Sequence, residues 1–104
     1  MKKIIIFGST GSIGSSLIEI VKNDKNIKIE LISANKNYKR LIKQAKTFGV
    51  KNLIITDQNS YLKAKIILKN KKINVYDNFE CLDKIFKNKK VDYTMSAISG
   101  FQGL

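Results

Sequence analysis

A glycine-rich segment near the N-terminus most constrains what this chain can fold into. Gly8, Gly11 and Gly14 follow the apolar run of residues 4–7, and apolar side chains then recur at helical intervals. A strand that enters a helix through such a turn is the context in which glycines bind a dinucleotide. In that context Gly8 permits a tight turn, Gly11 lets the backbone approach a pyrophosphate, and Gly14 lets the helix pack closely on the strand. We therefore predict a dinucleotide-binding unit at the start of the chain.

The spacing of these glycines leaves one alternative open. They follow G-x-x-G-x-x-G rather than the commoner G-x-G-x-x-G, and a glycine-rich turn can also join a strand to a helix without binding anything. The helix after the turn favours binding, because unpaired N–H groups and the positive dipole end at a helix N-terminus suit phosphates. The apolar positions of this helix are Ile13, Leu17, Ile20 and Val21.

Apolar runs and helical patterns alternate along the rest of the chain, which predicts a parallel sheet with helical crossovers. We expect strands at residues 3–7, 28–33, 52–56, 75–76 and 92–97. We expect helices at residues 12–23, at 38–48, from residue 57 or 58 onward, and around residues 82–86. The predicted fold class is therefore α/β, with a Rossmann-like doubly wound parallel sheet.

Two of the expected helices carry apolar side chains that should face the core. They are Leu41, Ile42, Ala45 and Phe48 in the second helix, and Leu62, Ile66 and Ile67 in the third. Gly49 is the expected C-terminal stop of the second helix. A chain of 104 residues can form one domain. Because a doubly wound sheet normally continues past its switch point, we expect residues 1–104 to be the N-terminal part of a larger, incomplete nucleotide-binding domain.

The charge and composition of the chain limit its partners. The net charge is +12, but Arg40 is the only arginine among 20 basic residues. Specific nucleic-acid readers tend to add arginines or stacking aromatics to the phosphate-binding charge. We therefore expect weak, salt-sensitive binding to polyanions and no specific nucleic-acid partner. No apolar run approaches the length of a membrane span, so we expect no membrane partner.

Cysteine and histidine usage bears on chemistry. Cys81 is the only cysteine and cannot form an internal disulfide, which fits a reducing cytoplasm. The sequence has no histidine, so it offers neither histidine acid–base catalysis nor a histidine-bearing metal site. We assign no catalytic residue and no metal ligand to this chain.

The end of the second expected strand bears on the choice of cofactor. An NAD-binding unit has an acidic residue about 20 residues past the glycines, which holds the ribose 2′-hydroxyl. The nearest acid here, Glu30, lies inside the strand, and Lys36, Lys39 and Arg40 follow the strand instead. A cation attracts a 2′-phosphate that a carboxylate would repel, so the pattern favours NADP over NAD.

Three segments resemble one family. Residues 8–14, Gly-Ser-Thr-Gly-Ser-Ile-Gly, closely resemble the opening of the 1-deoxy-D-xylulose 5-phosphate reductoisomerases. Residues 34–37 resemble the Ala-Gly-Lys-Asn stretch of that family, and residues 97–104 resemble its Ala-Ile-x-Gly-x-x-Gly-Leu segment. The three segments occur in the family's order and span the chain, but they cover only the N-terminal part of the cofactor domain of a much longer enzyme.

The resemblance assigns residues to NADPH. It implies that the pyrophosphate and the neighbouring ribose are contacted by Thr10, Gly11, Ser12 and Ile13. These residues lie in the cofactor-binding turn that begins at Gly8 and ends at Gly14. It implies that Lys36 and Asn37 face the adenosine ribose and its 2′-phosphate, and that the approach to the nicotinamide half is lined by Ala97, Ile98 and Gly100. Asn35 stands where the family usually has glycine, and we expect the turn to survive because asparagine tolerates a left-handed backbone.

The resemblance also implies an activity. In that family a metal-assisted rearrangement of 1-deoxy-D-xylulose 5-phosphate is followed by reduction with NADPH to 2-C-methyl-D-erythritol 4-phosphate, for non-mevalonate isoprenoid synthesis. The family's Mg²⁺ or Mn²⁺ ligands and its substrate site lie beyond residue 104, so we expect this chain alone to be inactive. We expect the full-length enzyme to be a homodimer in the bacterial cytoplasm or a plastid-type stroma.

Two other functions remain open at this point. One is another NADP-dependent oxidoreductase, similar to aspartate-semialdehyde dehydrogenase, whose opening also uses a Gly-x-Thr-Gly turn. The other is a nucleotide-binding or regulatory module without chemistry. The paired Lys36-Asn37 and the segment from Gly100 to Leu104 favour the reductoisomerase family over both.

Overall fold

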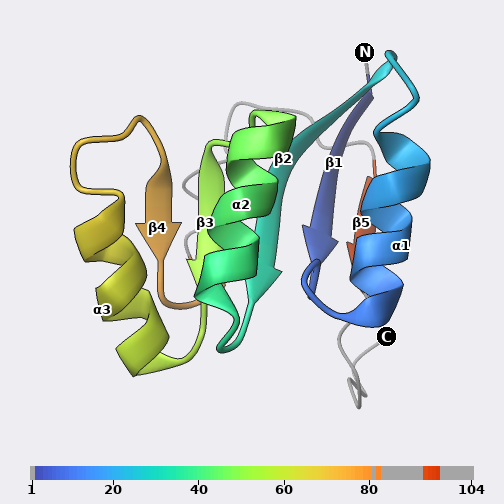
Figure 1. Cartoon of the computed structure of the whole chain (residues 1–104). Helices are drawn as coiled ribbons and strands as arrows, with labels where there is room; N and C mark the ends of the chain where they lie inside the picture. Colours follow the sequence, from blue (N-terminus) through green and yellow to red (C-terminus); the bar gives the residue numbers. More distant parts are fainter. Residues whose placement is uncertain (1, 81, 83–92, 97–104) are drawn as a thin grey trace.

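The computed structural model describes residues 2–80, 82 and 93–96, which form a parallel sheet with helices between its strands. The strands are β1 (Lys2–Phe7), β2 (Ile27–Ala34), β3 (Asn52–Ile55), β4 (Asn74–Tyr76) and β5 (Tyr93–Ser96). The helices are α1 (Ser12–Val21), α2 (Tyr38–Phe48) and α3 (Gln58–Ile67). The five strands run parallel in the order β4-β3-β2-β1-β5 (Figure 1). The predicted α/β class is confirmed.

The order of the strands places a switch point beside β1. From β1 the chain moves outward through β2, β3 and β4, and β5 then pairs with the other side of β1. Ligands of such sheets bind outside the carboxyl ends of the strands at this reversal. The glycine turn directly follows β1, so the fold puts it at the expected position.

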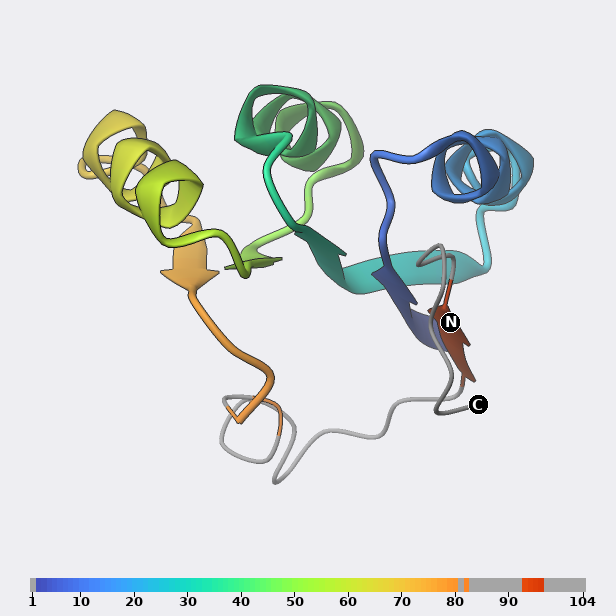
Figure 2. The same ribbon diagram turned by 90° about the horizontal axis from the view of Figure 1, so that it is seen from below.

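The three helices α1, α2 and α3 all lie on one face of the sheet (Figure 2). The larger apolar cluster fills the space between them and the sheet, with Ile4, Ile32 and Leu53 among its fully buried members. A second cluster around Leu31 and Ile54 lies on the opposite face. The described residues therefore form the half of a Rossmann-like sheet whose helices share one face.

Helix α2 agrees with the sequence-based prediction. It spans the expected residues, and its expected core positions are buried or partly buried. Gly49 ends the helix with a φ of 68°, and the N–H of Val50 donates to the carbonyl of Ala45 over 2.9 Å. This is the left-handed stop that favours glycine.

The apolar faces predicted for α1 and α3 are partly wrong. In α1, Ile18 and Val21 are buried, whereas Ile13 and Ile20 are 62% and 70% exposed. Gly14, Ile18 and Val21 share one stripe of the helix, and the close packing of Gly14 on the turn rotates that stripe inward.

In α3, the expected core residues Leu62, Ile66 and Ile67 are exposed. The buried positions are Ser60, Ala64 and the C-cap Leu68. Small side chains at Ser60 and Ala64 let this helix approach the sheet, and the larger apolar residues then point elsewhere.

Several element ends differ from the expected ones. Helix α1 ends at Val21, before the expected residue 23, and β5 covers the middle of the expected strand at residues 92–97. The turn that follows α1 explains its early end, because the N–H of Asp24 donates to the carbonyl of Val21 over 3.0 Å. The helix expected around residues 82–86 lies, apart from Leu82, outside the described residues.

Candidate functional site

The carboxyl ends of the strands and the N-termini of α1, α2 and α3 meet along one edge of the sheet, the lower edge in Figure 1. The turn after β1 joins the end of β2 there, because Gly8 N donates to Ser33 Oγ and Ser9 N donates to the Ser33 carbonyl, both over 3.0 Å. The end of β2 in turn holds the loop after β3 through Thr56 N and the Ala34 carbonyl, 3.1 Å apart. The structure therefore brings together the two predicted cofactor segments, residues 8–14 and 35–37.

The three glycines of the turn differ in whether the fold requires them. Gly8 has a φ of 75°, which favours glycine. A Cβ on Gly14 would lie 2.1 Å from the Gly8 carbonyl oxygen and 2.6 Å from Ser9 Cα. A Cβ on Gly11 would lie 3.7 Å from its nearest neighbour, an ordinary contact. Folding therefore explains Gly8 and Gly14, whereas Gly11 leaves a bare stretch of backbone that the fold itself does not require.

Gly11 is also the N-cap of α1, with extended backbone angles of −73° and 175°. It has no side chain to cap the helix, although its carbonyl accepts from Ser15 N over 2.8 Å. Thr10 is half-buried beside it, and Ile13 is exposed in the first helical turn. The N-terminus of α1 thus presents backbone N–H groups and a positive dipole end, which suit a phosphate or pyrophosphate.

The loop after β2 is exposed, and hydrogen bonds to the loop after β3 hold it in place. Asn35 Nδ2 donates to Thr56 Oγ1 over 2.7 Å, and the Asn35 carbonyl accepts from Asp57 N over 3.1 Å. Asn35 does not need the left-handed backbone that asparagine tolerates, because no described residue other than glycine has a positive φ. The turn needs no glycine here because hydrogen bonds to the loop after β3 hold it.

Asn37 has a structural role that the sequence did not predict. Its Oδ1 accepts from Arg40 N over 3.3 Å, which makes Asn37 the side-chain cap of α2. Cap and cofactor contact are compatible, since the cap uses the amide oxygen of the side chain and a cofactor can accept from its amide nitrogen.

Cationic side chains flank this loop. Lys36, Lys39 and Arg40 are exposed, and the Arg40 guanidinium donates to Ser15 Oγ on α1 over 3.0 Å. Hydrogen bonds from the side chain and backbone of Ser60, with a smaller contribution from the Lys36 ammonium, hold the pKa of Asp57 below its usual value. Arg40 thus lies between the glycine helix and the loop that follows β2, where the sequence predicted positive charge.

Sequence reasoning missed two residues that hold the turn, Ser9 and Gln44. Ser9 Oγ donates to Gln44 Oε1 over 2.8 Å, and Gln44 Nε2 donates to the Ser9 carbonyl over 2.9 Å. Ser9 is fully buried and Gln44 is 8% exposed. The signal in the sequence was a glutamine in the apolar stripe of α2, three residues after Leu41.

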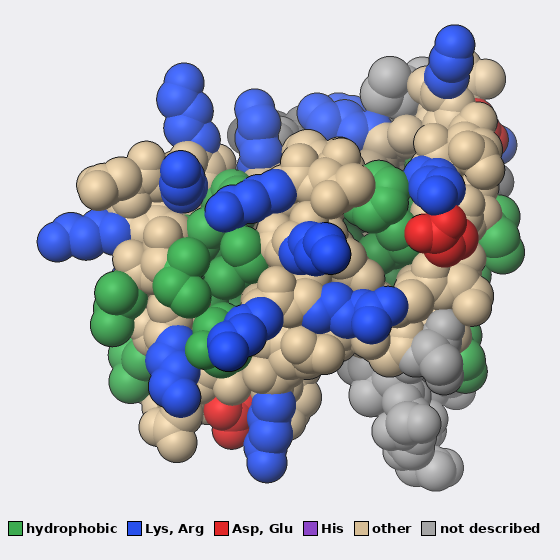
Figure 3. Space-filling view, viewed as in Figure 1, with side chains coloured by type: hydrophobic (Ala, Val, Ile, Leu, Met, Phe, Trp, Pro, Cys, Tyr) green, Lys and Arg blue, Asp and Glu red, His purple; other side chains and the backbone are tan. Residues whose placement is uncertain are grey.

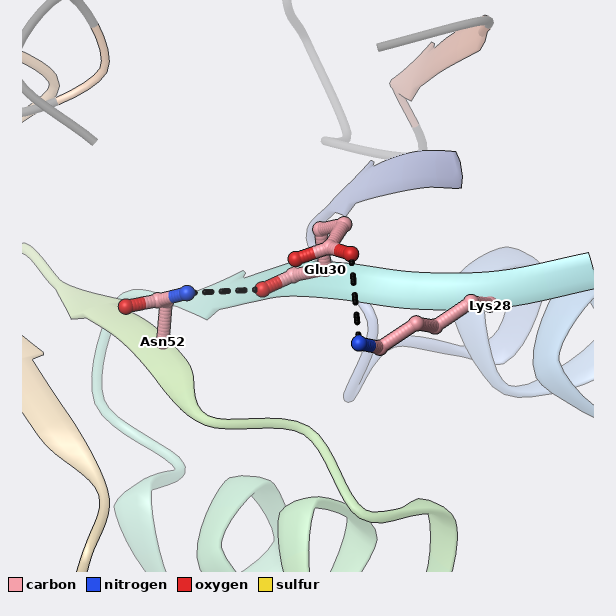
Figure 4. A network of polar contacts seen from close by, with 3 residues as sticks. All are labelled: Lys28, Glu30 and Asn52. Carbon is pink, nitrogen blue, oxygen red and sulfur yellow. Dashed lines mark hydrogen bonds and ion pairs between the residues drawn. The ribbon is translucent and has the colours of Figure 1, made fainter. Parts of the chain in front are cut away.

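Glu30 does not lie at the site. It is in the middle of β2, next to the irregularity at which the pairing with β1 shifts. Its side chain is 6% exposed and pairs with Lys28 Nζ at 3.6 Å, while its carbonyl accepts from Asn52 Nδ2 over 3.1 Å (Figure 4). The expectation that Glu30 cannot serve as the ribose-binding acid agrees with this placement.

The surface carries its positive charge in a dispersed form. Figure 3 shows lysine and arginine side chains spread over the helical face with apolar side chains between them.

Within the described residues there is no group of three histidine, cysteine or acidic side chains that could hold a metal ion. No helix in the same part of the chain is long and apolar enough to cross a membrane. Ala97, Ile98 and Gly100, predicted to line the nicotinamide half, lie outside the described residues.

Comparison with known proteins gives one consistent result. Residues 4–104 match the family model for 1-deoxy-D-xylulose 5-phosphate reductoisomerase. The chain is 64% identical to the reductoisomerase of Pelagibacter ubique over 100% of its own length and 27% of that relative. It is similar to the structure of the Zymomonas mobilis reductoisomerase in complex with NADPH, with 28% identity and a TM-score of 0.78, over 93% of this chain and 26% of that one. A reductoisomerase structure with NADPH, fosmidomycin and magnesium shares the fold, with a TM-score of 0.80 and 22% identity over 94% of this chain and 24% of that one. The chain spans about a quarter of the length of these relatives.

Proposed function

The chain belongs to the 1-deoxy-D-xylulose 5-phosphate reductoisomerase family, and from this premise we propose that it is the NADPH-binding part of such an enzyme. The complete enzyme would isomerise 1-deoxy-D-xylulose 5-phosphate and reduce the product with NADPH to 2-C-methyl-D-erythritol 4-phosphate. NADPH supplies the hydride for that reduction. The residues described here would bind and orient it.

The observation that carries the proposal is the geometry of the glycine turn. Close packing requires glycine at position 14 and a positive φ favours it at position 8, but neither reason applies to Gly11. Bare backbone at the N-terminus of α1, at the switch point of a parallel sheet, fits a pyrophosphate. We propose that Thr10, Gly11 and the first residues of α1 hold it there.

The charges after β2 support NADPH over NADH. Lys36 and Arg40 lie beside the N-terminus of α2, and Asn37 caps that helix. A 2′-phosphate placed there would meet two cations and a second positive helix end. The structure of the Zymomonas mobilis relative with NADPH supports the same choice.

The finer parts of the proposal concern the rest of the enzyme. We propose that Mg²⁺ or Mn²⁺ is held by carboxylates outside this chain, and that the enzyme acts as a homodimer in the bacterial cytoplasm or a plastid-type stroma. The magnesium in the relative with fosmidomycin supports the choice of metal. Family membership disfavours an enzyme of the aspartate-semialdehyde dehydrogenase kind, and the turnover experiment below tests the module without chemistry.

A chimera tests the proposed function. The chain replaces the matching 27% of the Pelagibacter ubique relative, and oxidation of NADPH is followed at 340 nm with 1-deoxy-D-xylulose 5-phosphate and Mg²⁺. We expect turnover that depends on both the substrate and the metal. A folded chimera that binds NADPH without turnover would favour the module without chemistry, and one that does not bind NADPH would overturn the cofactor assignment.

A further inference from the structure

Gln44 is a buried polar residue that contacts the glycine turn from a different element. Its amide oxygen accepts from Ser9 Oγ over 2.8 Å, and its amide nitrogen donates to the Ser9 carbonyl over 2.9 Å. Ser9 lies between Gly8 and the helix N-terminus, and its carbonyl also lies 3.4 Å from Ser15 Oγ. One side chain of α2 therefore fixes both the backbone and the hydroxyl of a residue inside the proposed pyrophosphate turn.

Apolar packing and polar contacts both join α1 to α2, and Ile18 and Val21 of α1 share one apolar cluster with Leu41 and Ala45 of α2. An open groove separates α1 from α2, lined by Ile18 and Lys22 on one side and by Lys43 and Thr47 on the other. Across this region, Gln44 of α2 bonds to Ser9 of the glycine turn, and Arg40 of α2 bonds to Ser15 of α1. The position of the glycine turn relative to α2 thus depends on these hydrogen bonds as well as on the shared apolar cluster.

The same helix carries the other half of the proposed site. Asn37 caps its N-terminus, and Lys36 immediately precedes that cap. Gln44 therefore connects the proposed pyrophosphate turn to the proposed 2′-phosphate loop through one rigid element. A dinucleotide must reach both at once, so an error in their relative position would weaken binding even if each half kept its shape.

We propose that Gln44 is a positioning residue for the cofactor, which sets the distance between the pyrophosphate turn and the adenosine loop. The inference rests on the proposed function. It adds a residue that touches no cofactor and acts through Ser9, and it predicts how the chemistry of the amide controls affinity.

The test compares Gln44→Leu with Gln44→Glu in the chimera, using titration with NADP⁺, which tolerates acid. A protonated glutamic acid can accept from Ser9 Oγ and donate to the Ser9 carbonyl, as the amide does, whereas a carboxylate can only accept. Burial raises the pKa of such a carboxyl group. We expect Gln44→Leu to lower the affinity between about 10- and 100-fold. We expect Gln44→Glu to approach the wild-type affinity at pH 5 and to lose it as the pH rises to 8.

Thr47→Glu is the matched control, because it adds the same charge to the groove one turn away. It should show no such dependence once each affinity is divided by that of the wild type at the same pH. Unfolding curves at each pH confirm that the proteins titrated are folded. If folded Gln44→Leu binds NADP⁺ like the wild type, or if Gln44→Glu shows no pH dependence relative to Thr47→Glu, the positioning role is wrong. Failure of the wild-type chimera itself to bind NADP⁺ would instead overturn the proposed function and this inference with it.

Discussion

At the scale of single residues, Gly11 and Gly14 separate binding from folding within one turn. A Cβ on Gly14 would meet backbone atoms at 2.1 and 2.6 Å, and backbone cannot move aside cheaply. Gly14→Ala should therefore destabilise the fold by about 3 kcal/mol or more. Gly11→Val should cost about 1 kcal/mol or less in stability, as N-cap changes do.

Binding should show the opposite order. Gly11→Val places a branched side chain where the pyrophosphate would approach the backbone, so affinity for NADPH and NADH should fall alike, roughly tenfold or more. Urea unfolding and cofactor titration of the chimera measure both quantities. Unchanged affinity in a folded Gly11→Val protein would indicate a turn that binds nothing.

Lys36 tests the choice between the two cofactors. Lys36→Glu should weaken NADPH about 10- to 150-fold through the loss of one charge-assisted contact, roughly 1.5–3 kcal/mol, and should leave NADH nearly unchanged. Lys46→Glu is the control, since it makes the same charge change in the last turn of α2, away from the site. Equal losses for NADPH and NADH would contradict the assignment of Lys36 to the 2′-phosphate.

The sequence predicted the roles of single residues where the role depends on local chain geometry. The three glycines and Gly49 need only their neighbours in sequence to be interpreted. It did not predict the pairing of Ser9 with Gln44, which joins residues 35 positions apart, nor the hydrogen bonds that hold Asn35. Such contacts depend on how α2 packs on the sheet, which a local pattern does not contain.

At the scale of elements, the start of α2 combines a helix cap with a proposed phosphate site. Asn37→Ala removes the oxygen that accepts from Arg40 N, and should cost about 1 kcal/mol in stability. Asn37→Asp keeps a capping oxygen, so stability should be retained. Its carboxylate would repel the 2′-phosphate, and affinity for NADPH should fall several-fold more than affinity for NADH. If Asn37→Asp and Asn37→Ala lose the two cofactors equally, Asn37 only caps the helix.

The N-cap of α3 predicts a dependence of stability on pH. Hydrogen bonds from Ser60 lower the native pKa of Asp57 below 3.8. The unfolded chain therefore binds the proton more readily than the native one, so the stabilisation is complete above that value and is lost as the pH falls through the native pKa. The urea midpoint of the wild type should exceed that of Asp57→Ala at pH 6, and the gap should narrow towards pH 3.

Asp77→Ala is the control for that experiment, because it removes the same charge from a residue that begins no helix. A gap between wild type and Asp57→Ala that stays constant from pH 6 to pH 3 would show that the capping interaction does not depend on the carboxylate charge.

The bounds and buried faces of the helices could be predicted from the sequence to different degrees, depending on the size of the side chains that pack on the sheet. Helix α2 has a strong apolar stripe and a glycine stop, and its bounds were right. The buried faces of α1 and α3 were not, because tight packing of Gly14, Ser60 and Ala64 fixes how these helices rotate. Small residues carry little hydrophobic signal, so a pattern of large apolar side chains overlooks them.

At the scale of the whole molecule, the last prediction concerns catalysis by this chain alone. The chain has eight carboxylates and no histidine, and it spans about a quarter of the relatives it matches. Hard divalent cations are held by clustered oxygen ligands, and without such a Lewis acid the rearrangement loses several kcal/mol of stabilisation. We expect weak NADPH binding at best from purified residues 1–104, and no consumption of NADPH with 1-deoxy-D-xylulose 5-phosphate and Mg²⁺. We also expect low solubility, because β5 is the last strand of the sheet that the described residues form, and an unpaired edge favours aggregation. The chimera, assayed beside it, should turn over. Metal-dependent turnover by residues 1–104 above a blank would show that these residues carry the chemistry themselves.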